Sequence, residues 1–230
     1  MPEEATRDVV TFHSYVLAQD EEVSTEFIAT YRRIFEDPPW NEYKKCPSCI
    51  QLDGNPLKFS RETFDKLRAG KCNKCGLVLV SYFSDEHIRN DLRNALSRKN
   101  PSCHFVRHNG QLIGFCYGCE YSYEELEHEL ELNGLVRGLE NAFGRKRCAY
   151  QDEIAIDAPY RRRGYAKQIF RLRHQDFLAS GIQIGVVRTQ TKPPSVTYKW
   201  YTKSGYAIVA AYGDNGARIV LACDLTTLVI

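Results

Sequence analysis

Four cysteines stand in two pairs whose spacing is typical of a metal site. Cys46 and Cys49 are separated by two residues, as are Cys72 and Cys75, and 22 residues lie between the pairs. A two-residue gap lets both thiolates of a tight turn reach one ion, and Zn²⁺ takes four such soft ligands in a tetrahedron. Gly76, directly after the second pair, eases that turn. The sequence therefore predicts a structural Zn²⁺ site whose four ligands are all thiolates.

A second stretch has the features of an anion site. Residues 149–156 alternate in polarity, which predicts a strand, and residues 165–180 carry apolar side chains at helical spacing. Between them runs a tight basic turn, Asp157-Ala158-Pro159-Tyr160-Arg161-Arg162-Arg163-Gly164. Backbone N–H groups at the start of such a helix lack intrahelical acceptors, and together with the helix dipole they bind phosphate. Gly164 has no Cβ, so the backbone can approach a diphosphate closely.

The elements expected after this turn follow a distinctive order: a strand over 182–188, a short helix over 195–204 and a hairpin. Two motifs lie within them. Arg161, Gly164 and Ala166 fit the pattern Arg/Gln-x-x-Gly-x-Gly/Ala, and the later helix ends with Tyr201, Gly205 and Tyr206 in the pattern Tyr-x-x-x-Gly-Phe/Tyr. In this order the motifs resemble the C-terminal half of the GNAT superfamily of acetyl-CoA-dependent N-acetyltransferases.

The resemblance implies that acetyl-CoA is the cosubstrate. Its diphosphate would be held by the turn and the start of the helix, which comprise Arg161, Arg162, Arg163, Gly164, Tyr165 and Ala166. In the superfamily the pantetheine amides pair with the fourth strand where the fifth splays away. This assigns backbone contacts, including one N–H donor to the developing oxyanion, to Ile154, Ala155 and Ile156.

The implied reaction, attack of an amine on the acetyl thioester in a ternary complex, needs a base. An aliphatic amine is mostly protonated near neutral pH and must lose a proton before it attacks. Glu153 is the candidate, directly or through water, and it matches an acidic position often found in the superfamily. Asp152 is its competitor, because adjacent strand residues face opposite sides. A structural ion pair between Glu153 and an arginine is the alternative to a catalytic role.

The resemblance also implies a proton donor for the departing coenzyme A thiolate. Tyr201 holds that position in the later motif, whereas simple packing beside Trp200 and Tyr198 is the alternative. The sequence departs from the family nearby, since the asparagine that commonly lies seven residues before this tyrosine is replaced by Pro194.

The predicted zinc module interrupts the family pattern. Helices expected over 21–35 and after Ser84 are consecutive in that pattern, but here the module, which resembles a zinc ribbon, lies between them. We therefore expect a GNAT domain formed by 1–43 and 81–230, with a zinc ribbon inserted over 44–80. The fold class is α/β (α+β): a mixed, mostly antiparallel sheet of six to seven strands flanked by helices.

Composition limits the alternatives. The chain has 230 residues, 43% of them hydrophobic, and a net charge of +2, which by itself indicates neither a nucleic-acid nor a membrane surface. It has no apolar run of membrane-spanning length, and its charged N-terminus does not resemble a signal peptide, so we expect a cytoplasmic protein. The five cysteines outside the two pairs are expected to be buried, and the six scattered histidines to have surface or capping roles.

An acidic segment bears on the acceptor. Residues 120–140 contain seven glutamates and one arginine, and a negative rim there would attract cationic amines. We therefore expect an N-acetyltransferase that prefers a small cationic amine slightly over a protein or peptide amine. The other hypothesis is a non-catalytic acyl-CoA-binding adaptor that docks through its zinc ribbon on nucleic acid or protein; nucleic-acid binding is not favoured. The sequence does not distinguish a monomer from a homodimer.

Overall fold

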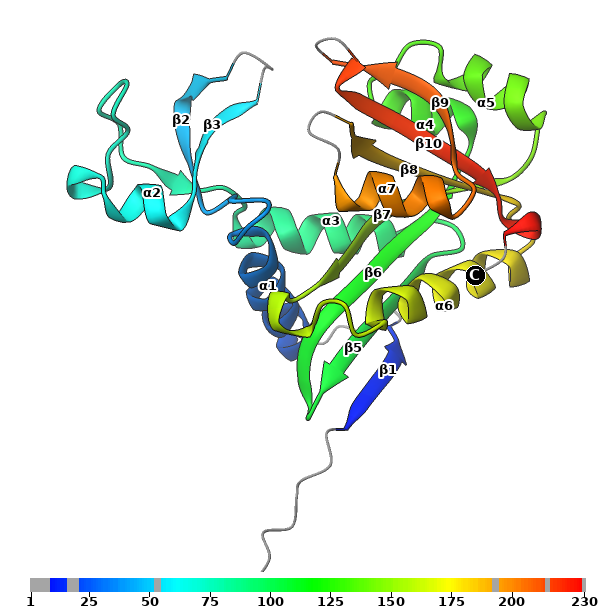
Figure 1. Ribbon diagram of the computed structural model, residues 1–230, viewed down its shortest axis with the longest axis horizontal. Coiled ribbons are helices and arrows are strands. Elements are labelled where there is room, and N and C mark those ends of the chain that lie inside the picture. Colours follow the sequence, from blue (N-terminus) through cyan, green and yellow to red (C-terminus); the bar gives the residue numbers. More distant parts are fainter. Residues whose placement is uncertain (1–8, 16–20, 52–54, 192–194, 214–215, 229–230) are drawn as a thin grey trace, which may run out of the picture. The chain divides into compact units, whose positions relative to one another are not determined.

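The computed structural model describes residues 9–15, 21–51, 55–191, 195–213 and 216–228 (Figure 1). They fall into two units, each with its own β-sheet. The first unit combines segments 1–18, 94–156 and 160–230, and the second combines 19–93 and 157–159. Among the described residues, no helix has both the length and the apolar composition needed to cross a membrane.

The first unit contains a seven-stranded sheet with the order β1-β5-β6-β7-β8-β10-β9. The strands are β1 (Val10–Ser14), β5 (Ser102–His108), β6 (Gln111–Tyr121), β7 (Cys148–Ile156), β8 (Ile184–Gln190), β9 (Ala207–Tyr212) and β10 (Arg218–Asp224). Neighbouring strands are antiparallel except β7 and β8, which run parallel. The sheet confirms the predicted mixed, mostly antiparallel architecture.

Four helices of this unit flank the sheet. They are α4 (Tyr123–Glu129), α5 (Leu135–Phe143), α6 (Tyr165–Ala179) and α7 (Val196–Lys203). Helix α6 packs along β5, β6 and β7, and α7 lies beside it (Figure 1), with the Phe170 ring against those of Trp200 and Tyr201. The buried face of α6 includes Ile169 and Phe177, so the helical periodicity predicted over 165–180 is confirmed.

Strands β7 and β8 pair over only three residues. Cys148, Ala149 and Tyr150 lie opposite 184–186, and no later pair joins the two strands. Beyond that point β7 stays paired with β6 as far as Ile156, while β8 stays paired with β10 along its whole length. The sheet therefore opens into a fork between residues 151–156 and 187–190 (Figure 1).

A β-bulge lies in β7 where the fork opens. Tyr117 pairs with Glu153 and Cys119 with Tyr150, so two β7 residues lie opposite the single residue Gly118. A Cβ on Gly118 would come within 2.4 Å of the Tyr150 carbonyl oxygen. The bulge therefore requires glycine at this position of β6, and it shifts the alternation of side chains by one residue along β7.

The second unit contains the cysteine pairs. Its sheet has the order β3-β2-β4, with β2 (Lys44–Ile50), β3 (Pro56–Phe59) and β4 (Val80–Ser81). Helix α1 (Glu21–Phe35) comes before the three strands in the sequence, and the short α2 (Arg61–Asp65) lies between β3 and β4. Helix α3 (Asp85–Ser97) follows β4, and its last residues, 94–97, belong to the first unit. The Ser84 hydroxyl accepts a hydrogen bond from the His87 amide at 3.1 Å, which confirms the predicted start of α3.

Substitution of Gly118 tests the bulge. We expect Gly118→Ala to lower the free energy of unfolding by about 1–3 kcal/mol, because the added methyl group forces a backbone shift in a close-packed sheet. Denaturant unfolding followed by circular dichroism measures this. Ala207→Ser, at an exposed position on the edge strand β9, is the control and should change stability by less than about 0.5 kcal/mol. Equal stability of the Gly118→Ala protein and the wild type would show that the bulge does not need glycine.

Candidate active site and metal centre

The fork presents two different faces of β7. Ile154 and Ile156 pack against the hydrophobic cluster that includes Ile169 of α6, so Glu153 and Ala155 lie on the opposite face of the strand. Gln151 also contacts α6 through its side chain, which bonds to Arg173. In a regular strand Gln151 and Glu153 would share a face. The bulge separates them and directs Glu153 to the side of its cross-strand partner Tyr117.

The two candidate bases differ in exposure. Glu153 is half-buried, whereas Asp152 is exposed. Both carboxylates lie near Arg188 of β8, whose pKa is raised, first by the neighbouring Tyr150 and also by Tyr212, Asp152 and Glu153. Acidic and basic groups from both arms of the fork therefore lie close enough to interact, and the choice between Glu153 and Asp152 stays a prediction.

The turn after β7 has the open backbone expected of an anion site. Gly164 caps α6 in the left-handed conformation, with φ 85°, and the space where its Cβ would lie is empty to 4 Å. The Arg161 side chain turns back and donates from Nε to the Ile156 carbonyl at 2.9 Å. Arg162 and Arg163 are exposed, with the Arg163 guanidinium 5.5 Å from the centre of the Tyr160 ring. At least two guanidinium groups are therefore accessible beside the start of α6.

Tyr201 lies where the two arms separate. It belongs to one buried cluster with Val187, the first β8 residue beyond the paired region, and Ile154 of β7 packs against that cluster. Its side chain is 2% exposed, and its hydroxyl accepts a hydrogen bond from Arg173 at 3.3 Å. Burial raises the pKa of Tyr201, and the Arg173 guanidinium opposes that shift. Trp200 packs against Tyr201, which agrees with the alternative of a packing role. The Tyr201 hydroxyl, however, also has a polar partner in Arg173.

A buried polar network that the sequence did not predict lies behind the fork. It joins Gln151 of β7, Arg173 and His174 of α6, Tyr201 of α7 and Tyr206 after it. One signal was present in the sequence, because Arg173 lies on the apolar stripe of α6 at positions i+4 and i+3 from Ile169 and Phe170. An arginine on a core-facing stripe indicates a buried polar partner.

The expectation that all six histidines have surface or capping roles was wrong for two of them. His174 is 2% exposed, and burial together with Arg173 lowers its pKa to about 3. His104 is also buried and bonds to Asp176 at 2.7 Å. A lone histidine gives no indication of burial in the sequence when its partners lie on other elements. The expectation for the five cysteines outside the pairs is confirmed, since all of them are buried.

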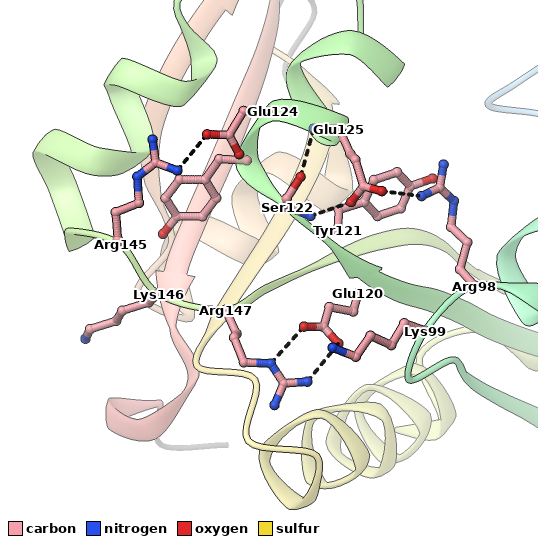
Figure 2. A pocket seen from close by; sticks show the side chains of 11 residues that line it. Arg98, Lys99, Glu120, Tyr121, Ser122, Glu124, Glu125, Arg145, Lys146 and Arg147 are labelled. Atoms are coloured by element: carbon pink, nitrogen blue, oxygen red, sulfur yellow. Dashed lines mark hydrogen bonds and ion pairs between the residues drawn. The ribbon is translucent and has the colours of Figure 1, made fainter.

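Most glutamates of the acidic segment have basic partners, and Figure 2 shows three of them. Glu120 receives two hydrogen bonds from Arg147, each 2.7 Å long, and the bond from Arg147 lowers the Glu120 pKa. Glu124 pairs with Arg145 at 2.6 Å, and Glu125 lies 3.9 Å from Arg98. These groups line a cavity of about 620 Å³ at the C-terminal end of β6.

Two of these glutamates also have structural roles. Glu125 forms a capping box with Ser122 at the start of α4, and the Glu127 carboxylate accepts a hydrogen bond from the Val136 amide at 2.9 Å. The arginines that pair with the segment lie before and after it in the sequence. They largely compensate the negative charge on which the expected preference for a cationic acceptor was partly based.

The two cysteine pairs converge in the second unit. The four sulfur atoms of Cys46, Cys49, Cys72 and Cys75 all lie within 4.8 Å of one another. The Sγ atoms of Cys46 and Cys75 are 3.4 Å apart. Zn–S bonds of about 2.3 Å in a tetrahedron place the sulfurs roughly 3.8 Å apart, so the four thiols fit one zinc ion. Gly76 has a positive φ of 76° in the second turn, as its position predicted.

Local backbone groups favour the thiolate form of Cys46, whereas the neighbouring thiols raise the pKa of Cys49. Burial alone raises the pKa of Cys46, but N–H groups of Ser48 and Cys49 bond to its sulfur and bring the pKa down to about 6. Besides the cysteines, the buried residues around the cluster are Phe59 and Leu79. A metal ion held by the four thiols would add to the stability of so small an apolar core.

Comparison with known proteins identifies the family. A family model described as the acetyltransferase (GNAT) family matches residues 76–206, which is more than half of the chain. The chain belongs to the GNAT acetyltransferase family. The match confirms the resemblance that was based on the motifs at 161–166 and 201–206. The protein is therefore an acyltransferase, and acetyl-CoA is its expected acyl donor.

Solved structures with the same fold are distant in sequence. FeeM, an N-acyl amino acid synthase from uncultured soil microbes, is 11% identical with a TM-score of 0.56, and 96% of this chain and 93% of that chain are covered. The polyamine N-acetyltransferase of Drosophila melanogaster is 13% identical with a TM-score of 0.55, covering 94% and 100%. PaiA N-acetyltransferase from Thermoplasma acidophilum, solved with coenzyme A, is 11% identical with a TM-score of 0.51, covering 94% and 99%. No curated protein matches the sequence.

Within this GNAT acetyltransferase, the structure brings several predicted residues together at the fork. Glu153, Ile154, Ala155 and Ile156 lie on one arm, and Tyr201 lies where the arms separate. Pro194 is outside the described residues, so its substitution for the family asparagine stays without a structural account.

The low pKa of His174 predicts acid sensitivity of the acetyltransferase. An unfolded histidine titrates near 6.5 and this one near 3, so between these values the unfolded state binds one more proton. Stability should therefore fall as the pH is lowered through this range, by up to about 1.4 kcal/mol per pH unit from this residue. Denaturant unfolding between pH 7 and pH 4 should give a shallower dependence for His174→Gln than for the wild type.

The control for this experiment is His128→Gln, at an exposed position of α4. It should keep the wild-type dependence of stability on pH. If His174→Gln also kept that dependence, His174 would not be the neutral buried group that its surroundings indicate.

Removal of a thiolate tests the metal centre. We expect the purified acetyltransferase to contain one zinc per chain and Cys46→Ser to lose nearly all of it, because three thiolates leave the tetrahedron incomplete. Atomic emission spectroscopy measures the metal. Cys223→Ala, a buried cysteine on β10 outside the cluster, is the control and should retain the zinc. Zinc bound equally by Cys46→Ser and wild type would exclude this ligand set.

Proposed function

We propose that the protein transfers the acetyl group of acetyl-CoA to a primary amine by direct attack in a ternary complex. The observation that carries the proposal is the opening of the sheet between β7 and β8, with Glu153 on one arm and Tyr201 where the arms separate. An acyl thioester lying in this opening would have a carboxylate on one side and a phenol on the other. Those are the two groups that aminolysis of a thioester needs.

The donor is held by backbone groups in this proposal. Residues 151–156 of β7 have no β8 neighbour, so those backbone groups of 154–156 that point away from β6 are offered to the pantetheine amides. The amides at the start of α6 and the side chains of Arg162 and Arg163 bind the diphosphate, and Gly164 admits it because nothing fills the space beside its Cα. Arg161 contributes by holding the turn against β7 through the Ile156 carbonyl.

Proton transfer is divided between two residues. Glu153 takes the proton from the ammonium form of the acceptor, directly or through water, since it is half-buried on the face of β7 away from α6. One backbone N–H of residues 154–156 stabilises the negative charge that develops on the acetyl oxygen when the amine attacks the acetyl carbon. Tyr201 then donates its proton to sulfur as the carbon–sulfur bond breaks.

A small cationic amine remains the acceptor that we favour over a protein or peptide amine. The reason now lies at the fork rather than in the acidic segment, most of whose glutamates have basic partners. Asp152 and Glu153 supply two negative charges near the positive charge of Arg188, and the other cation at the fork, Arg173, is fully buried and belongs to α6. A cationic group that enters beside the two carboxylates is attracted by them at short range.

Conservative variants of both candidates test the proposed roles. Glu153→Gln and Tyr201→Phe should each lower kcat by about 100-fold or more, because a positioned acid or base contributes that much to the rate. Release of the coenzyme A thiol across a panel of amines measures turnover. Asp152→Asn is the matched control and should retain most of the activity if Glu153 is the base.

Two outcomes would contradict this assignment. Loss of activity in Asp152→Asn but not in Glu153→Gln would make Asp152 the base. Tight binding of acetyl-CoA by calorimetry without turnover of any amine would favour the non-catalytic adaptor.

A further inference from the structure

We propose that Arg173 is the positioning residue that makes Tyr201 a proton donor. By donating to the tyrosine oxygen, the guanidinium leaves the O–H free to point at the departing sulfur and stabilises the tyrosinate formed. This inference rests on the proposed acid role of Tyr201.

Arg173 is a fully buried cation at the point where the fork opens. Its side chain is 0% exposed, and its two terminal nitrogens donate four hydrogen bonds. One nitrogen reaches the carbonyls of Tyr117 at 3.1 Å and Glu153 at 2.8 Å. The other reaches the Gln151 side-chain oxygen at 2.8 Å and the Tyr201 hydroxyl at 3.3 Å. One side chain therefore joins both strands of the bulge to the candidate acid.

The direction of these hydrogen bonds follows from chemistry. A guanidinium only donates, so the Tyr201 oxygen is the acceptor in its bond to Arg173. The Tyr201 proton is then available to another group. Among the residues that the structure describes, no acceptor for that proton is found. The geometry thus keeps the phenol protonated and its proton uncommitted beside the gap between β7 and β8.

The neighbouring network fixes this arrangement. His174 donates from Nδ1 to the Phe170 carbonyl at 2.7 Å, so its Nε2 is left to accept from the Tyr206 hydroxyl at 3.0 Å. Tyr206 in turn accepts from the Gln151 amide at 2.7 Å, which orients the Gln151 oxygen towards Arg173. The Gln151 amide nitrogen also lies 3.4 Å from His174 Nε2. Tyr201 joins this network through Arg173, and its hydroxyl proton has no acceptor within it.

The charge of Arg173 is not neutralised by an ion pair. Among the described residues, none of the carboxylates forms a salt bridge with it. In a buried site of low polarity, an uncompensated positive charge 3.3 Å from a phenol oxygen stabilises the phenolate strongly. The same charge favours release of a thiolate nearby. Arg173 therefore assists the step in which negative charge appears at sulfur and then at Tyr201.

The proton balance of that step is complete. The amine nitrogen forms a bond to the acetyl carbon after giving one proton to Glu153, and the carbon–sulfur bond breaks with its electron pair going to sulfur. Sulfur takes the proton of Tyr201, which becomes a tyrosinate held by Arg173. The nitrogen and Glu153 each release one proton to solvent, and solvent returns one proton to Tyr201, so that one proton is released overall.

A double-mutant cycle separates this role from a structural one. Arg173→Met, which keeps the length of the side chain but donates no hydrogen bond, should lower kcat by about 10- to 100-fold in the wild-type background. In the Tyr201→Phe background the same change should lower kcat by less than about threefold, because the group through which Arg173 acts is absent. Gln151→Met is the matched control, since it removes another bond to the guanidinium without touching Tyr201.

The pH profile supplies an independent measurement. Loss of the positive charge should move the alkaline limb of kcat to higher pH in Arg173→Met, and Tyr201→Phe should lack that limb. Arg173→Lys, which keeps a cation, should retain more activity than Arg173→Met. It replaces the methionine variant in these experiments if that variant does not fold. Thermal unfolding of each variant checks its integrity.

The outcomes separate two failures. If Tyr201→Phe is impaired but Arg173→Met lowers kcat by the same factor in both backgrounds, Arg173 acts only through the bulge and the inference is wrong. An equal loss in Gln151→Met would lead to the same conclusion. If Tyr201→Phe turns over at the wild-type rate, the proposed acid role itself fails, and the role of Arg173 fails with it.

Discussion

The limited pairing of β7 with β8 is the constraint on which the rest of the site depends. Because the parallel neighbours separate after Tyr150, the edge of β7 that faces β8 has no ladder partner beyond that residue. Such an edge persists because each arm is held from its other side, β7 by β6 and β8 by β10. A cosubstrate with amide groups spaced along an extended chain would find hydrogen-bond partners there.

The bulge and the buried arginine meet a second requirement, which is to hold different chemical groups on each side of one strand. Without the extra residue in β7, Glu153 would share the face of Gln151 and lie against α6. Gly118 makes room for the bulge, and Arg173 caps the Tyr117 and Glu153 carbonyls beside it. Burying a guanidinium without a carboxylate is costly unless its donors are satisfied. Four backbone and side-chain acceptors bond to its two terminal nitrogens, whereas the buried Nε has no hydrogen-bond partner among the described residues. A positive charge is thus held beside Tyr201.

Features that depend on local pattern were predictable from the sequence, and features that depend on distant partners were not. The helix over 21–35 and the cysteine cluster follow from helical periodicity and ligand spacing. The candidate site was located through two motifs, each of which spans six consecutive residues. The bulge was missed because it shows only when β6 and β7 are paired in register. His174 was missed because its partners, Gln151 and Tyr206, lie 23 and 32 residues away.

The pairing of charges in space could not be predicted from the sequence either, and it bears on how the acceptor is selected. The acidic segment carries an excess of glutamates when counted along the chain, but Arg98, Arg145 and Arg147 arrive from other elements and pair with them in space. The field at a site is set by charges that lie within a few ångströms and by those that remain unpaired. At the fork the charged groups are Asp152, Glu153, Arg188 and the buried Arg173. Acceptor preference should therefore depend on these groups, because most glutamates of the acidic segment have basic partners close by.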